Sequence, residues 1–385
     1  MRMGTAYWLC ALIMGSAAGQ VRAVEPDPCI PPDTIFAMKV RPRQILTSAL
    51  VKDLGWDELF KTTLATVGPV QEFLDTAGLR IDRDLESILF CMPSSPIVAD
   101  PDVPPQANDP ETEEIIRPDQ PAGEKPAKPW LMVLRGKFSS KKITKALADH
   151  GKRAGAPIRK LKGARTALLQ IDSELGPIFV GFDGNRKIIV SNQLERLKAG
   201  IAGSYDKPVS SLFRASMEYL TDHESFWMAH SNEGDLKSHL EKELKSFPHL
   251  IWKHLNSCQL GLTVSHEIQG KLTYSNQNFA SANAIQAELA FDIKIWKKEV
   301  EMFLSDPTSL IPKDILGNKE YSWINMMALW ELTIPYSAAR LSKMEIQGND
   351  TVFVINANRK SLEPLLQIFG LVKQEQEQEQ KGPQK

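Results

Sequence analysis

The 385-residue sequence lacks the short motifs by which many enzymes are recognised. It contains no Gly-x-Ser-x-Gly turn, no Cys-x-x-Cys pair, no His-Glu-x-x-His zinc motif and no glycine-rich dinucleotide-binding pattern. A large charge of one sign is also missing, because 46 basic residues face 47 acidic ones. With a net charge of −1 there is no overall field to recruit nucleic acid. We therefore expect no nucleic-acid partner and no cofactor, and we name no catalytic residue.

Cysteine is scarce, with four residues in the whole chain. Cys29 precedes the first predicted strand and Cys91 lies near the end of the second, so antiparallel neighbours would bring the two together. A disulfide between them would stabilise the fold by about 4 kcal/mol on the chain-entropy model. The sequence leaves two alternatives open, a Cys29–Cys91 bridge or unpaired buried thiols at Cys29, Cys91 and Cys258.

Long hydrophobic runs are limited to the N-terminus. Arg2 supplies a positive start, residues 6–19 form an apolar run, and Val21-Arg22-Ala23 provides small residues at the cleavage positions. This pattern is typical of a signal peptide at residues 1–23, since the run is shorter than the ~20 residues that span a bilayer. We expect an exported protein, in the periplasm, the cell envelope or outside the cell, without a transmembrane segment after cleavage.

Two segments have too few apolar residues to form a core. Residues 93–129 contain ten of the 25 prolines and eight acidic residues, and residues 372–385 are a glutamine- and glutamate-rich tail. Such compositions cannot bury enough surface to offset the entropy of ordering. Both segments are predicted to be disordered.

The rest of the chain alternates between strand and helix patterns. Alternating apolar runs separated by turn residues predict hairpins at 178–190, 259–274 and 343–355. Apolar residues at spacings of three and four from Phe279 to Phe303 predict a long amphipathic helix. We predict an α+β fold with two related lobes, residues 24–205 and 206–371, each a mostly antiparallel sheet with helices packed on one face.

Two groups of residues resemble catalytic or metal sites. Ser139 and Lys142 have the Ser-x-x-Lys spacing of serine acyl-transfer enzymes, but the accompanying Lys-Thr-Gly strand is absent. Ser139 or Ser140 is better explained as the cap of a helix. Six of the seven histidines lie at 223–266 without the spacing of a zinc helix. We predict no metal ligand, and a hydrolase with a site in region 223–266 stays as an alternative.

One local cluster of positive charge surrounds the turn at Gly163. Its members are Arg153, Arg159, Lys160, Lys162 and Arg165. The cluster is either a solvated rim or a binding surface for an acidic partner, which includes the chain's own acidic stretch at 109–119.

The segment from Gly136 to Gly151, GKFSSKKITKALADHG, together with the hairpins that follow, resembles a layout found in large exported bacterial proteins without assigned function. The resemblance spans about residues 30–370 and implies a two-lobed α+β protein; it carries no catalytic residue. We expect a non-catalytic binding or structural role with an unknown protein or envelope component as partner. The alternatives are the hydrolase and a periplasmic chaperone-like module.

Overall fold

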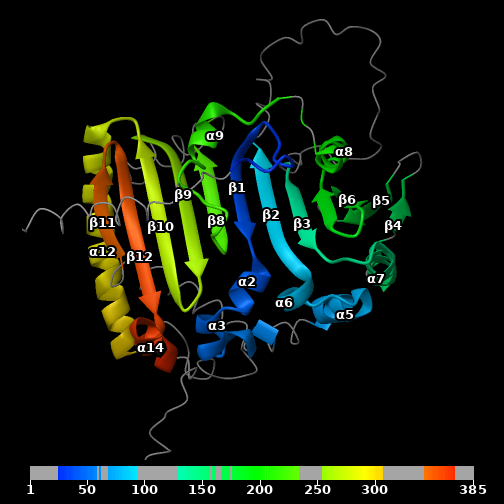
Figure 1. The fold of residues 1–385 in the computed structure, drawn as a ribbon, viewed down its shortest axis with the longest axis horizontal. Coiled ribbons are helices and arrows are strands. Elements are labelled where there is room, and N and C mark those ends of the chain that lie inside the picture. The colour runs from blue at the N-terminus through cyan, green and yellow to red at the C-terminus, as the bar shows by residue number, and fades with distance from the viewer. Residues whose placement is uncertain are drawn as a thin grey trace, which may run out of the picture.

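The strands that the structure describes form one antiparallel sheet. The computed structural model describes residues 25–368 except 59, 62–67, 94–128, 154, 157, 162–165, 174–175, 204, 206, 234–253 and 307–341. Twelve strands run across the sheet in the order β11-β12-β10-β9-β8-β1-β2-β3-β7-β6-β5-β4 (Figure 1). The predicted α+β class with antiparallel pairing is confirmed. The predicted leader, the insertion from residue 94 onward and the tail lie outside the described residues.

The N-terminal half of the sheet comes from residues before 204. Its strands are β1 (Thr34–Val40), β2 (Leu85–Pro93), β3 (Leu131–Gly136), β4 (Ile158–Lys160), β5 (Leu168–Ser173), β6 (Gly176–Asp183) and β7 (Lys187–Ser191). Its helices are α2 (Pro42–Leu46), α3 (Ala49–Asp53), α5 (Gly68–Ala77), α6 (Ile81–Asp84), α7 (Ser140–Arg153) and α8 (Leu194–Ala202).

The C-terminal half comes from residues after 207. Its strands are β8 (Phe226–Ser231), β9 (Leu255–Val264), β10 (Glu267–Asn276), β11 (Ser342–Gln347) and β12 (Asp350–Asn358). Its helices are α9 (Ser211–Ala215), α12 (Phe279–Ser305) and α14 (Arg359–Ile368). The hairpins β6–β7, β9–β10 and β11–β12 are the three that the alternating patterns predict.

The first strand of each half joins the two halves. β1 and β8 pair antiparallel, with Met38 opposite Met228. Because β1 also pairs with β2, and β8 with β9, the sheet continues from one half into the other. The strands of both predicted lobes therefore belong to a single sheet.

Helices cover both faces of this sheet. Neighbouring residues of a strand point to opposite faces, so Ala37 and Met38 define what we call the Ala37 face and the Met38 face. On the Ala37 face, Leu197 of α8 and Phe213 of α9 pack in the same core cluster as Ala37. The prediction of helices on one face is wrong. The central strands carry apolar side chains on both faces, so helices can pack against either face.

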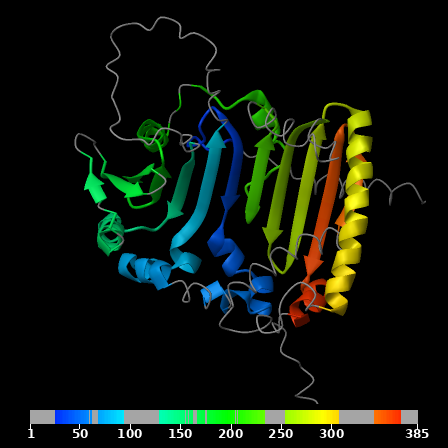
Figure 2. The ribbon, with the colours of Figure 1, turned by 180° about the vertical axis from the view of Figure 1, so that it is seen from behind.

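Helices α7 and α12 pack on the Met38 face. Ile143 of α7 belongs to the core cluster around Val180, which lies in the same cross-strand row as Met38. Ile285 and Leu289 of α12 pack against Phe353 of β12, at the other end of that row (Figure 2). The predicted amphipathic helix is confirmed as α12. Within the described ranges, no helix is long and apolar enough to cross a membrane.

Candidate functional site

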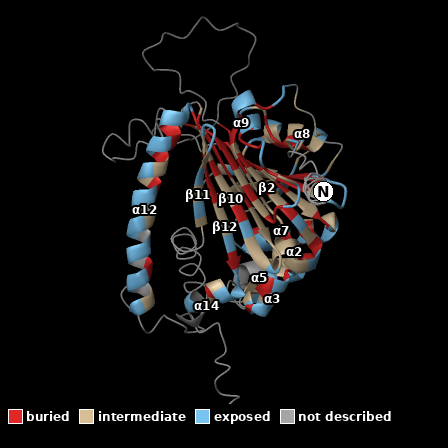
Figure 3. Cartoon of the chain, turned by 60° about the vertical axis from the view of Figure 1, so that its left-hand side comes forward, coloured by how far each residue is buried: buried red, intermediate tan, exposed pale blue. Residues whose placement is uncertain are grey.

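A band of half-buried apolar side chains crosses the middle of the Met38 face, and we call it the central strip. Its members are Trp130, Met132 and Leu134 at β3, Ile88, Phe90 and Met92 of β2, Phe36, Met38 and Val40 of β1, Phe226 and Met228 of β8, and Leu260 and Leu262 of β9. Every one of these residues is intermediate in burial, whereas their strand neighbours Ala37, Leu89, Leu131 and Trp227 on the other face are almost fully buried. Figure 3 shows this alternation along the strands.

The two ends of the central strip meet the clusters of α7 and α12. Leu134 packs against the α7 cluster, and Leu272, the β10 neighbour of Leu260, packs against the α12 cluster. The strip therefore runs between two helices that stand on the same face of the sheet. Apolar atoms that remain accessible to water there gain about 25 cal/mol per Å² when they are covered.

A buried histidine lies beside the strip. His230 of β8 stands opposite Phe36 on one side and Cys258 on the other, and it is 8% exposed. Its Nε2 atom has no hydrogen-bond partner among the described residues, and an unsatisfied nitrogen costs free energy in a buried position. Burial lowers the pKa of His230 and the Glu233 carboxylate opposes this shift, so the imidazole is held in its neutral form.

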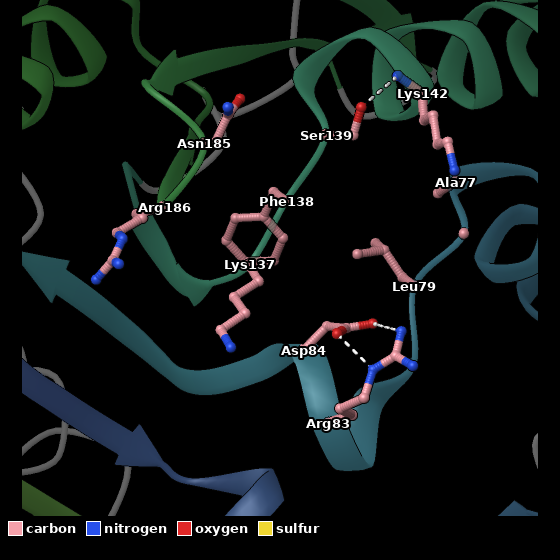
Figure 4. A pocket seen from close by; sticks show the side chains of 11 residues that line it. Ala77, Leu79, Arg83, Asp84, Lys137, Phe138, Ser139, Lys142, Asn185 and Arg186 are labelled. Carbon is pink, nitrogen blue, oxygen red and sulfur yellow. Dashed lines mark hydrogen bonds and ion pairs between the residues drawn. The ribbon is translucent and has the colours of Figure 1, made fainter.

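A second feature is an open pocket at the corner where β3 leads into α7, and we call it the corner pocket. Its volume is about 410 Å³. Four segments line it: the end of α5 at Ala77–Leu79, α6 at Arg83 and Asp84, residues Lys137–Lys142, and the β6–β7 turn at Asn185 and Arg186 (Figure 4).

Backbone contacts hold the segments of the corner pocket together. The Lys137 N–H donates to the Asp84 carbonyl over 2.8 Å, and the Gly136 N–H donates to the Arg186 carbonyl over 3.0 Å. Only glycine fits at position 136 without a shift of the backbone, because a Cβ there would lie 2.0 Å from the Asp84 carbonyl oxygen. The glycine thus allows β3 to pass directly against the start of β2.

Charge in the corner pocket is predominantly positive. Arg83 donates to both carboxylate oxygens of Asp84, at 2.8 and 3.0 Å, and this holds the pKa of Asp84 below its usual value. The remaining cations of the lining are Lys137, Lys142 and Arg186, all exposed and without an ion-pair partner among the described residues.

The Ser-x-x-Lys motif has a structural role in this corner. The Ser139 hydroxyl accepts a hydrogen bond from the Lys142 backbone N–H over 3.4 Å, and its carbonyl accepts from Ile143. Ser139 therefore caps α7, as the capping interpretation predicts.

The predicted basic cluster is only partly described. Arg153 pairs with Glu72 of α5, and Arg159 pairs with Asp172 of β5 at 3.1 Å. Lys160 is exposed at the end of β4, while Lys162 and Arg165 lie outside the described residues. A partner for this cluster stays a prediction.

His223, His230 and His266 of the proposed hydrolase region do not converge, and His239 and His249 lie outside the described residues. His230 lies near the end of β8, whereas His223 precedes the strand and His266 lies in the β9–β10 turn, near the beginning of β8. His223 and His266 are both exposed. Among the described residues, no three His, Cys, Asp or Glu side chains are grouped so that they could hold a metal ion.

Cys29 and Cys91 lie in the same core cluster, and both are buried free thiols. Burial raises the pKa of each, and the Asp27 carboxylate adds to this effect. The disulfide between them stays a prediction.

Sequence reasoning missed both the central strip and the corner pocket. The strip was visible only as alternating strand residues, because its members come from five strands far apart in the chain. Lys137 and Lys142, which flank the helix cap Ser139 in the sequence, were a signal for the corner pocket. Arg186 is distant in the sequence, and only the folded chain brings it to the same pocket.

No protein-family profile and no curated protein matches this sequence. One solved structure, crystal form I of the protein TP0453, is similar at a TM-score of 0.37 and 10% sequence identity. The match covers 90% of this chain and 99% of that chain. No residue role follows from so remote a likeness.

Proposed function

We propose that this is an exported, non-catalytic binding protein whose ligand is apolar and lies on the central strip. The observation that carries the proposal is the row of half-buried Phe, Met, Leu and Trp side chains between α7 and α12. Ligand sites are mostly apolar with a few placed polar groups, and the unpartnered Nε2 of His230 supplies one beside the strip. An acyl chain with a single polar end has the matching chemistry.

The residues of the strip favour an adaptable surface over a rigid pocket. Met38 and Met228 lie opposite each other at the junction of the halves, with Met92 and Met132 nearby in the strip. Methionine is unbranched and polarisable, so it adjusts to ligands of different shape. This composition favours binding of a class of ligands, such as lipid acyl chains, over binding of a single defined molecule.

We further propose that the two halves are related lobes, each of which contributes one helix beside the strip. Each half has three antiparallel strands, then a helix, and ends its sheet with a hairpin whose last strand lies beside the third strand; the N-terminal half has β4 and β5 before that hairpin. The residues that follow the third strand of each half also make matching contacts. The Lys137 N–H donates to the Asp84 carbonyl after β3, and the Gln277 N–H donates to the His254 carbonyl after β10. Related lobes account for α7 and α12 on the same face.

The binding proposal is tested with a fluorescent fatty acid such as cis-parinaric acid. Wild-type protein is expected to enhance its fluorescence saturably, and Met38→Gln with Met228→Gln is expected to weaken binding by about tenfold. Leu212→Gln is the matched control, since it removes an apolar side chain that is 42% exposed away from the strip. Equal binding by the double variant and the wild type contradicts the proposal.

The same surface suits a chaperone-like role, in which the ligand is an unfolded apolar polypeptide. Two results together would favour that alternative. The wild type would suppress aggregation of a denatured client protein and the Met38/Met228 double variant would not, and neither protein would bind the fatty acid. The hydrolase alternative has less support, because His223, His230 and His266 are separated along β8.

A further inference from the structure

The corner pocket differs from an ordinary surface depression in its charge. Three cations, Lys137, Lys142 and Arg186, line one cavity of about 410 Å³ and make no ion pair among the described residues. The single carboxylate of the lining, Asp84, is already occupied by Arg83 and by the Arg80 N–H, which donates to it over 2.9 Å. The pocket therefore has a local excess of about three positive charges.

Holding like charges around one cavity costs free energy in the unliganded protein. The fold does not require these charges, because the side chains are exposed and the segments are held by backbone hydrogen bonds. The corresponding corner of the C-terminal half makes the same backbone contacts with neutral residues. There the Asn276 N–H donates to the Asn349 carbonyl, and Gln277 stands where Lys137 stands.

The backbone adds to the positive character of the corner pocket. Helix α7 begins at Ser140, and Ser139 and Lys142 of its first turn both line the cavity. The N–H groups of a first helical turn and the helix dipole favour an anion at that position. Lys142 reaches across to α5, where a Cβ on Gly78 would lie 3.3 Å from its Nζ atom.

We propose that the corner pocket binds a phosphate group. Lys137 and Lys142 of one segment and Arg186 of the β6–β7 turn line the cavity. The Arg186 guanidinium is a planar fork that can bind two phosphate oxygens, and the lysines act as point charges. Phe138 and Leu79 give the pocket an apolar wall, so the group carried by the phosphate also has a contact surface. The inference stands on the corner pocket alone and does not depend on the central strip.

Two sources could supply this group, free phosphate or the headgroup of a lipid. Binding is measured by calorimetry at low ionic strength with two probes, inorganic phosphate and monomeric dihexanoyl phosphatidic acid. The test variant is Lys137→Gln/Lys142→Gln/Arg186→Gln. The control Lys207→Gln/Lys343→Gln/Arg359→Gln removes the same charge from exposed positions outside the pocket.

The wild-type protein and the control variant are expected to bind at least one probe with equal affinity. The affinity of the test variant for that probe is expected to be lower by about tenfold or more. The thermal midpoint of the unliganded test variant is expected to equal or exceed that of the wild type, since repulsion is relieved. This separates lost binding from lost folding.

Equal affinity for both probes identifies the phosphate group alone as the ligand chemistry, and tighter binding of phosphatidic acid identifies a headgroup. Failure of the wild type to bind either probe at millimolar concentration overturns the proposal. So does an affinity of the test variant that equals that of the wild type. Fatty-acid binding by the central strip is unaffected by either result, which keeps the two proposals apart.

Discussion

The two halves of the sheet share the order of their first three strands and of their last hairpin, whereas β4 and β5 add two strands to the N-terminal half. Positions that match in this shared order differ in chemistry. Where β3 ends, the N-terminal half has Gly136 against the Asp84 carbonyl, and where β10 ends, the C-terminal half has Asn276, whose side chain donates to the Asn349 carbonyl. In the strand second from the junction, Leu89 corresponds to Gln259. The end of the third strand therefore accommodates either a glycine in close backbone contact, as at Gly136, or a buried amide side chain, as at Asn276.

The difference shows which features the fold needs and which it does not. Both corners keep two backbone hydrogen bonds at the end of the third strand, one to the turn of the later hairpin and one to the residue before the second strand. At the N-terminal corner, the cations Lys137, Lys142 and Arg186 line a cavity of about 410 Å³, whereas the described residues at the matching C-terminal positions, Asn276, Gln277 and Asn349, are neutral. A feature present in one half and absent from the other is a better candidate for function than one that both halves share.

The corner glycine gives the largest expected effect. Gly136→Ala places a Cβ 2.0 Å from a backbone oxygen that cannot move away without disturbing β2, and should cost about 3 kcal/mol or more. Asn276→Ala loses side-chain hydrogen bonds of 2.9 and 3.0 Å and should cost about 1–3 kcal/mol. Urea unfolding measures both. A smaller cost for Gly136→Ala than for Asn276→Ala would contradict the tight contact.

The exchange of Leu89 and Gln259 is the next comparison. Leu89→Gln buries an amide in an apolar cluster and should cost about 3 kcal/mol. Gln259→Leu removes an Nε2 that has no partner and a 3.4 Å bond from the Tyr219 N–H, so unfolding free energy should stay within about 1 kcal/mol. Equal costs in denaturant unfolding would show that the two environments are alike.

Acid should affect the two halves in different pH ranges. The folded-state pKa of His230 is lowered, so its contribution to stability is complete above the unfolded value near 6.5 and is lost as the pH falls below it. The pKa of Asp84 is lowered too, so its contribution is lost only as the pH falls below about 3.9. As the pH falls below about 6.5, the unfolding free energy should decrease by up to about 1.4 kcal/mol per pH unit. The variant His230→Phe should remove this decrease and leave the loss at the lower pH of Asp84 unchanged.

The smallest expected effect concerns the acidic insertion. Deletion of residues 94–128 should change the unfolding free energy by less than about 0.5 kcal/mol, because Arg153 and Arg159 already pair with Glu72 and Asp172. Thermal unfolding of the deletion variant measures this. A clear loss of stability would instead support an intramolecular contact between the insertion and the predicted basic cluster.

Sequence reasoning predicted the local elements well and the relations between them poorly. The three hairpins and the helix from Phe279 to Phe303 follow from residues close together in the chain. Ser139 was correctly expected to cap a helix, since a cap depends on the next three residues. The central strip was not predicted, because Met38 and Met228 are 190 residues apart and nothing in either strand specifies its partner.

By itself, the sequence determined the α+β class, the antiparallel hairpins and the long amphipathic helix, because period and turn chemistry act over a few residues. The tertiary structure decided that β1 pairs with β8, that helices cover both faces, and that Lys137, Lys142 and Arg186 surround one cavity. A strand has two edges of unpaired backbone groups and can pair at either one. Which distant strand it meets depends on the packing of the whole sheet.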